Sequence, residues 1–484
     1  MRPVVVRTAP VAHEKNSAPA HGATGSRVVS TTIKHDTLTG WLAQRALQAT
    51  ADSLPDDTLV WAQHSLMDWL SLVAAGWRAP DVQRLLTCAT RGATVETATS
   101  FGNGQRCGME AAVLVNGTAG HILDFDDAHL KSRVHPAVPL WPAIMAYAER
   151  EALSGRQALA AFVAGVEVQS RLARVMGESH YRQGWHNTAT LGAFGAAAAI
   201  SRLKALDHDG ICRAFGIVAS LASGMHKAFG SAVKPFQVAR ASANGLLAAE
   251  LAETGFNAPL DVLDGETGYA RVHAAELHSR AIDLEPDHWA IRDIVFKYHA
   301  SCYGTQAPVE AALRFGTLHR RDIADIVVAI EPQYMSVCNI ADPKSDTQAK
   351  FSIKHMVALA LAGYDTADSR SYSKETLDNP ELKAWRERIQ VQADAEMKRA
   401  CARVDMRWKS GERRSETVDA SQPERDLGVQ SARLTAKSRA LLTEAGLHSH
   451  RITELQQHMH DIAHAPSLTQ WAKDYGACLA KALR

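Results

Sequence analysis

The sequence predicts a mainly α-helical protein, in which a large all-α domain completed by C-terminal helices carries a smaller inserted α+β domain. Three observations predict this fold class. Apolar residues recur every three to four positions over most of the chain, and many of them are alanine. Runs of β-branched residues gather in one later region. The 484 residues are also too many for one compact core, so two or three domains are expected.

The helical pattern begins near Thr37. In the segment 37–76, Trp, Leu and Ala stand three to four residues apart and predict two helices. Small residues that permit close helix packing, with no alternating strand pattern between them, predict further helices near 109–123, 138–153, 156–176, 188–203, 209–224 and 239–255. Residues 37–292 are therefore expected to form one all-α domain.

The character of the sequence changes near Asp293. The run 323–332 is rich in β-branched residues, and 402–420 is typical of a hairpin that turns at Lys409-Ser410-Gly411. With helices predicted at 304–315 and 350–362, residues 293–425 are expected to form the α+β domain.

The two ends of the chain have different compositions. Residues 426–484 return to helical spacing and are expected to pack against the first domain. Residues 1–36 are rich in Ala, Ser, Pro, Val and Thr without a helical period, so we expect a disordered N-terminal extension.

Composition excludes several classes of partner. Lys and Arg number 53 against 52 Asp and Glu, so no global field would attract nucleic acid or an anionic membrane. The longest apolar stretch, 189–200, is too short to span a bilayer. Seven scattered cysteines without a CxxC pair argue against a disulfide framework, and no secretory signal is visible, so a cytoplasmic location is expected.

Ionisable residues gather in four otherwise apolar segments. The first, 116–143, places three acids and two histidines after an apolar helix: Asp124, Asp126, Asp127, His129 and His135. Carboxylates and imidazoles together suit a divalent metal, or an acid–base pair in which a carboxylate orients a histidine. The alternative without a catalytic or metal-binding role is an acidic helix end with two solvated histidines.

The other three segments are equally open when taken alone. His186 precedes an Ala/Gly helix whose free N–H groups attract anions, although it could simply cap that helix. Lys234, with Arg240 six residues later, needs an anionic partner such as a substrate carboxylate if it is buried, or it reaches solvent. Lys297, His299, Cys302 and Tyr303 precede a helix, where Cys302 is either a nucleophile or structural.

Taken in order, these segments resemble the MmgE/PrpD family. The resemblance runs from about residue 37 to 470 and rests on six motifs, which are NGTAGHILDFDD, HPAVPLWPAIMAYAE, GWHNTATLGAFGAAAA, VKPFQVARASANGLLAAELAETGF, FNAPLDVLDG and GTQAPVEAAL. Six motifs in the same order are far more specific than any one of them.

The resemblance implies a large helical domain, an α+β lid domain and an active site between them. It also implies a homodimer that uses neither a metal nor an organic cofactor, which disfavours the metal interpretation. The implied function is that of a lyase, a dehydratase or decarboxylase of a small di- or tricarboxylic acid such as 2-methylcitrate or cis-aconitate, working by acid–base catalysis. An epimerase of a polycarboxylic amino or hydroxy acid, and an inactive binding protein of the same fold, are the alternatives.

Site residues follow from the motifs. Asp124 is similar to the first acid of the DFDD motif, His135 to the HP histidine, His186 to the GWH histidine and Lys234 to the KP lysine. The implied roles are an acid–base set and a carboxylate clamp, with Asp124 orienting a histidine. His129, Arg240 and Lys297 are expected to bind substrate.

Three positions depart from the family pattern. Tyr303 stands where a histidine is frequent, His355 where a tyrosine is frequent, and Gln237 where the KPxH pattern has histidine. We expect Tyr303 and His355 to enter the site from the lid as a proton donor and acceptor that have exchanged places. The family pattern leaves open which residue abstracts a proton.

Overall fold

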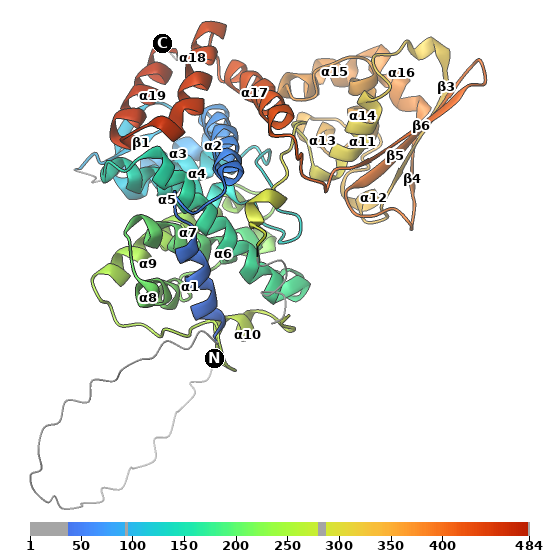
Figure 1. Cartoon of the computed structure of the whole chain (residues 1–484). Helices are drawn as coiled ribbons and strands as arrows, with labels where there is room; N and C mark the ends of the chain where they lie inside the picture. Colours follow the sequence, from blue (N-terminus) through green and yellow to red (C-terminus); the bar gives the residue numbers. More distant parts are fainter. Residues whose placement is uncertain (1–36, 92–94, 279–286, 483–484) are drawn as a thin grey trace, which may run out of the picture. The chain divides into compact units, whose positions relative to one another are not determined.

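A computed structural model describes residues 37–91, 95–278 and 287–482. The chain is mainly α-helical over these residues, as predicted (Figure 1). The extension expected at 1–36 lies outside the described residues. Within those three ranges, no helix is both long enough and apolar enough to cross a membrane.

A first hydrophobic core is built by the N-terminal helices. These are α1 (Leu38–Gln48), α2 (Asp56–Gly76), α3 (Pro80–Ala89), α4 (Met109–His121), α5 (Ala137–Arg150), α6 (Gly155–Arg182), α7 (Asn187–Leu203), α8 (His208–Val218), α9 (Val233–Glu253) and α10 (Tyr269–His273). Figure 1 shows α5, α6, α7 and α9 gathered around one another.

The small residues of these helices allow their backbones to approach closely. A Cβ added at Gly117 of α4 would lie 2.7 Å from the Cβ of Ala239 on α9. A Cβ added at Gly245 of α9 would lie 2.4 Å from that of Ala196 on α7. Because larger side chains would force these helices apart, the Ala/Gly composition directly determines how α4 and α7 pack on α9.

The helical region contains one β-hairpin that the sequence pattern did not predict. Strands β1 (Ala98–Ser100) and β2 (Gln105–Cys107) pair antiparallel. The buried Glu149 carboxylate accepts from the backbone N–H and the hydroxyl of Thr99, each at 2.8 Å. Strands of three residues are too short to show an alternating pattern, which explains why the expectation of uninterrupted helices was wrong.

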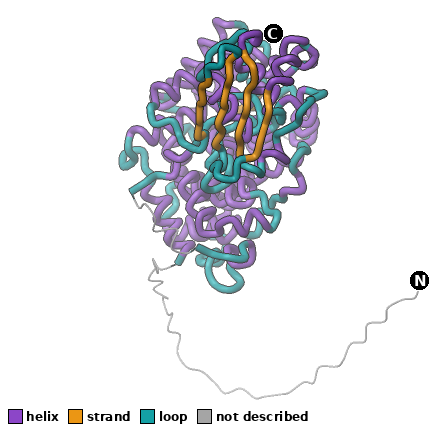
Figure 2. The backbone as a smooth tube through the Cα atoms, turned by 90° about the vertical axis from the view of Figure 1, so that its right-hand side faces the viewer, coloured by secondary structure: helices purple, strands orange, loops and turns teal. Residues whose placement is uncertain are grey.

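A second hydrophobic core includes one face of a four-stranded sheet of order β4-β3-β5-β6 (Figure 2). Strand β3 (Ile323–Ile330) pairs antiparallel with β5 (Cys401–Trp408), which forms the predicted hairpin with β6 (Arg413–Asp419). Strand β4 (Ile389–Ala393) was not predicted and pairs parallel with β3. The accompanying helices are α11 (Tyr303–Leu313), α12 (Tyr334–Val337), α13 (Asp346–Ala349), α14 (Ile353–Leu361), α15 (Lys374–Asp378) and α16 (Pro380–Arg388).

The C-terminal helices return to the first core. They are α17 (Leu427–Glu444), α18 (Ser449–His460) and α19 (Leu468–Ala482), and α17 packs against α2. Buried Lys437 of α17 lies 2.6 Å from the Asp68 carboxylate of α2 and donates to the carbonyl of Phe125 at 2.7 Å. Through its hydrogen bond to the Phe125 carbonyl, this lysine therefore anchors the loop that follows α4 to α17.

Four buried histidines are expected to make the fold sensitive to acid. Burial is the main cause that lowers the pKa of four histidines to about 4, namely His64, His129, His180 and His355. In the unfolded chain each should titrate near 6.5, so between pH 6.5 and 4 the unfolded state binds up to four more protons.

Stability should therefore fall as pH drops through this window, by about 1.4 kcal/mol per pH unit for each such proton. Urea midpoints at pH 7.5, 6, 5 and 4.5 measure the slope. His355→Gln should reduce the slope of stability against pH by up to the contribution of one proton. The buried neutral ring that accepts from Arg386 is then replaced by a group that does not titrate. A midpoint that is constant over this range would contradict the prediction.

Candidate active site

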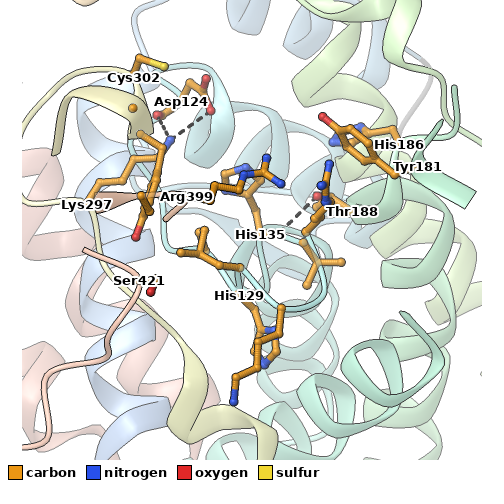
Figure 3. A pocket seen from close by; sticks show the side chains of 18 of the residues that line it. Asp124, His129, His135, Tyr181, His186, Thr188, Lys297, Cys302, Arg399 and Ser421 are labelled. Carbon is orange, nitrogen blue, oxygen red and sulfur yellow. Dashed lines mark hydrogen bonds and ion pairs between the residues drawn. The ribbon is translucent and has the colours of Figure 1, made fainter. Parts of the chain in front are cut away.

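A cavity of about 590 Å³ lies where the segments of the two cores meet (Figure 3). Its walls come from the loop between α4 and α5, from the segments that start α7 and α9, and from residues of the sheet-containing part. Among the described residues that line it, six carry a positive side chain (Lys131, Arg133, Lys234, Lys297, Lys398 and Arg399), whereas Asp124 is the one acid. Such a lining favours a small molecule with more than one negative charge.

The loop between α4 and α5 is held in an unfavourable backbone conformation. Asp124 has φ +51° and Arg133 has φ +53°, in the left-handed region that costs a non-glycine residue about 1–3 kcal/mol. Isolated antiparallel bridges join Ala128 to Val295 and His129 to Val134 and keep the loop in place. This geometry places Asp124 and His135 on the same cavity.

Asp124 contacts two lysines. Its Oδ1 lies 2.8 Å from Lys234 Nζ and 3.3 Å from Lys297 Nζ, and Lys297 also donates to its carbonyl oxygen. Burial would raise the pKa of Asp124, but Lys297 and then Lys234 hold that pKa well below its usual range. Among the described residues, the Asp124 carboxylate accepts no hydrogen bond from a histidine ring, which corrects the expectation that Asp124 orients one.

Asp126 takes that role instead. Its carboxylate lies 2.9 Å from Nδ1 of His121 and 3.2 Å from Nδ1 of His135. The His135 Nδ1 also donates to the carbonyl of Asp127 at 2.7 Å. Because a carbonyl can only accept, Nδ1 of His135 carries the proton, and Nε2 has a free lone pair when the ring is neutral.

The same triad bears on the metal interpretation. His121, Asp126 and His135 place their possible ligand atoms within 4.8 Å of one another. However, Nδ1 of His135, the nitrogen that faces Asp126, donates to the Asp127 carbonyl, and a protonated nitrogen cannot bind a metal. The triad is therefore better explained as a carboxylate that orients two imidazoles.

His186 lies directly before α7, and its side chain is buried against the cavity. The Nε2 amide of Gln237 lies 2.6 Å from its Nδ1, and the ring of Phe229 packs edge-on at 4.8 Å. Burial is the largest of the causes that hold the pKa of His186 well below 6.5, followed by His121 and Lys234. The ring is therefore neutral at pH 7.

Two further predicted residues line the cavity from either side. Both ring nitrogens of buried His129 lack a hydrogen-bond partner within the described part of the chain, and Nε2 lies 3.9 Å from Asp293. Tyr303 lines the cavity, but its hydroxyl donates to the carbonyl of Ala420 at 2.5 Å. Burial raises the pKa of Tyr303, so its phenol stays protonated.

Two predicted residues do not belong to this site. His355 is buried in α14, where Nδ1 accepts from Arg386 at 3.1 Å, and it does not line the cavity. The expected exchange between Tyr303 and His355 is therefore wrong, because α14 presents His355 to α16. Arg240 pairs with Glu110 at 2.5 Å on an exposed face of α9, also outside the cavity lining.

Four further cations of the cavity lining were not predicted from the sequence. Lys131 and Arg133 line the cavity but pair with Asp293 and Glu178, at 3.0 and 2.5 Å. Lys398 and Arg399 precede β5 and belong to none of the six motifs. In the view of Figure 3, Arg399 is seen between Lys297 and His135. Motifs could not predict these two side chains, because only the fold brings them to the cavity that Asp124 lines.

Two family models match this chain. The family model described as the MmgE/PrpD N-terminal domain matches residues 41–279, and that of the MmgE/PrpD C-terminal domain matches 299–461. Together they include the residues that line the cavity, with the exception of Lys297, which lies between the two matches.

Curated relatives carry related names. The chain is 28% identical over 291 residues to the cis-aconitate decarboxylase-like protein oryM of Aspergillus oryzae (strain ATCC 42149 / RIB 40), covering 57% of this chain and 60% of that protein. A cis-aconitate decarboxylase of Aspergillus terreus is 25% identical over 376 residues, 71% of this chain and 76% of the relative. The Homo sapiens cis-aconitate decarboxylase is 27% identical over 296 residues, with coverages of 58% and 61%. The chain thus matches only about three fifths of the Aspergillus oryzae and human proteins.

Proposed function

Because the chain belongs to the MmgE/PrpD family, we propose that it is a lyase acting on a small di- or tricarboxylic acid by acid–base catalysis. The observation that carries this proposal is one cavity that combines an oriented histidine with a surplus of cations. His135 has Nδ1 fixed by Asp126 and Asp127, so Nε2 is the free basic atom. Lys398 and Arg399 line the same cavity and form no ion pair with a carboxylate among the described residues, although Arg399 hydrogen-bonds the Tyr334 side chain, so both charges can meet substrate carboxylates.

In the proposed reaction, the cations first hold the carboxylates. His135 Nε2 then accepts the proton from a carbon next to a carboxylate, and negative charge develops on that carboxylate. Lys234 lies on the wall of the cavity and stabilises this charge in an environment where ionic interactions are strong. For dehydration, hydroxide leaves from the neighbouring carbon and takes up the proton that His135 received, so that water is released. For decarboxylation, the proton moves in the opposite direction: the C–CO₂ bond supplies the electron pair as CO₂ leaves, and protonated His135 donates from Nε2 to the resulting carbanion.

The names of the relatives make cis-aconitate the first substrate to test. The pure protein should be incubated with cis-aconitate, 2-methylcitrate and amino or hydroxy dicarboxylates, while alkene absorbance, CO₂ and deuterium exchange are followed. Alkene formation or CO₂ release supports the lyase. Deuterium exchange with inversion and no elimination would identify an epimerase instead. Binding without any of these changes would identify a non-catalytic binding protein.

We also propose that the sheet-containing part, about 293–425, acts as a lid over the helical part, about 37–292 with 426–484. The two separate hydrophobic cores support this division. Lys398, Arg399 and Tyr303 would then complete the cavity from the lid. Closure over substrate would exclude water from the reacting carbon.

A homodimer formed through the helical part is expected. Val233, Phe236 and Leu247 are 52%, 37% and 41% exposed, and their spacing places them on one stripe of α9 together with Arg240. Light scattering at micromolar concentration should return twice the 52.4 kDa of one chain. Leu247→Glu should shift the mass towards that of one chain, whereas Val95→Glu, an exposed control outside α9, should not. A wild-type mass of one chain would contradict the dimer.

Activity should survive the removal of metal. Because Nδ1 of His135 faces Asp126 and carries a proton, it is not a free ligand for an ion at the histidine–carboxylate triad. Dialysis against EDTA should leave kcat within about twofold of its starting value. A metal-dependent lyase would instead lose its activity together with its ion. Loss of activity that one divalent ion restores would refute this prediction.

A further inference from the structure

Gln237 contacts His186 but does not line the cavity. We propose that Gln237 is a positioning residue that fixes the proton of His186 on Nε2, so that His186 serves as a neutral hydrogen-bond donor to substrate and not as a base. The inference deepens the proposed function, because the role of His186 matters only if that cavity binds a carboxylate substrate.

The hydrogen bonds of Gln237 determine which way its amide points. Its Oε1 accepts from the backbone N–H of Met225 at 3.1 Å, and its Nε2 donates to the Met225 carbonyl at 3.3 Å. Exchanging the two amide atoms would set oxygen against a carbonyl and NH₂ against an N–H. The backbone of Met225 therefore requires Nε2 to be the atom that lies 2.6 Å from His186 Nδ1.

Because the amide nitrogen is a donor, His186 Nδ1 must accept. A neutral imidazole has one accepting and one donating nitrogen, so the proton is on Nε2. His135 has the opposite tautomer, since its Nδ1 donates to the Asp127 carbonyl. One cavity thus holds one histidine with a free basic nitrogen and another with a free N–H group.

The local backbone keeps the ring and the amide in register. The N–H of His186 donates to the carbonyl of Gly224 at 2.9 Å, and that of His226 donates to the carbonyl of Gly184 at 2.8 Å. Gly224 has φ +153°, and a Cβ there would lie 2.5 Å from Ala189. The segment that carries Met225 is therefore pressed against the start of α7.

The charged and titratable groups around His186 favour the neutral ring. They are His121 of α4, His135 of the α4–α5 loop, Lys234 of α9, and His226 of the segment before α9. Each adds to the effect of burial in lowering the pKa of His186. A donor that is neutral at every working pH makes no pH-dependent contribution to turnover. The family's KPxH histidine could supply a similar N–H at this position.

Three variants test the proposal. Gln237→Glu replaces the donor by an acceptor, so the proton of neutral His186 must move to Nδ1, and the new carboxylate raises the pKa of the ring. Turnover by this variant should fall as pH rises through that raised pKa, because Nε2 then loses its proton. Gln237→Met should lower kcat about tenfold without adding a pH-dependent limb, as expected for the loss of one hydrogen bond. Gln237→His should retain most of the activity.

The tautomer itself is measured on ligand-free protein labelled with ¹⁵N-histidine, with His186→Gln used to identify the signal. We expect Nε2–H in the wild type and Nδ1–H in Gln237→Glu above the pKa of the ring. A wild-type proton on Nδ1, or a Gln237→Glu pH profile parallel to that of the wild type, would overturn the proposal. Because the tautomer is read without turnover, an Nε2–H ring in a protein inactive on every polycarboxylate would reject the function and leave the tautomer assignment standing.

Discussion

Replacing His135 with glutamine should lower kcat on the accepted polycarboxylate by about two to four orders of magnitude, the usual contribution of a positioned general base. Nδ1 of His135 is held by the Asp127 carbonyl at 2.7 Å and by Asp126 at 3.2 Å, so Nε2 is the basic atom. The glutamine amide can still donate to Asp127, which preserves the loop but removes the base. KM should change little, because the cations that hold the carboxylates remain.

Two measurements separate the loss of a base from damage to the site. His450→Gln makes the same exchange at an exposed position outside the cavity lining and should leave kcat unchanged. In His135→Ala, added imidazole should restore part of the activity, because the truncated side chain leaves room for the ring beside the cavity. If His135→Gln folds and turns over within tenfold of the wild type, another group abstracts the proton.

Much of the helical architecture follows from local sequence. The predicted segment 109–123 corresponds to α4, and 188–203 to α7, because an apolar or Ala-rich period of three to four residues is a strong signal. Strand β4 and the β1–β2 hairpin were missed. Strand β4 pairs with β3, which only the tertiary fold brings to it, whereas the strands of the local β1–β2 hairpin are too short to show an alternating pattern.

The site could be predicted only where motif and geometry coincide. The motifs identified His135, His186 and Lys234, all of which line the cavity. They did not distinguish Asp124 from Asp126, because two positions along a loop do not reveal which carboxylate faces an imidazole and which faces a lysine. The positive φ of Asp124 makes that choice by turning its side chain towards Lys234 and Lys297.

The same limit explains the misplaced lid residue. His355 was predicted to enter the cavity by its correspondence with a family tyrosine. Helix α14 instead buries it against Arg386 of α16, and Arg399 reaches the cavity from the segment before β5. Correspondence along a motif therefore identifies a segment of this region, but it does not show in which direction each side chain of that segment points.

Replacing Lys234 with methionine should preserve the fold and lower kcat by two orders of magnitude or more, since one charge-stabilising donor is commonly worth about 3–4 kcal/mol in the transition state. Lys234 is well suited to this test. Its ammonium group lies 2.8 Å from Asp124 on the cavity wall and 5.3 Å from the ring centre of Phe229, so the methionine chain can occupy the same apolar path. Lys297 remains beside Asp124 and keeps that carboxylate paired.

The effect should appear in kcat more than in KM, because the charge that Lys234 stabilises develops as the proton or CO₂ leaves. Lys383→Met removes an exposed lysine of α16 that pairs with Asp378 at 3.0 Å outside the cavity, and it should leave both constants unchanged. Steady-state kinetics on both variants, with urea midpoints to confirm that each is folded, make the comparison. If Lys234→Met raised KM alone, Lys234 would only hold a substrate carboxylate in the ground state. A folded variant with unchanged kcat and KM would show that the reacting carbon lies elsewhere in the cavity, nearer to Lys398 and Arg399.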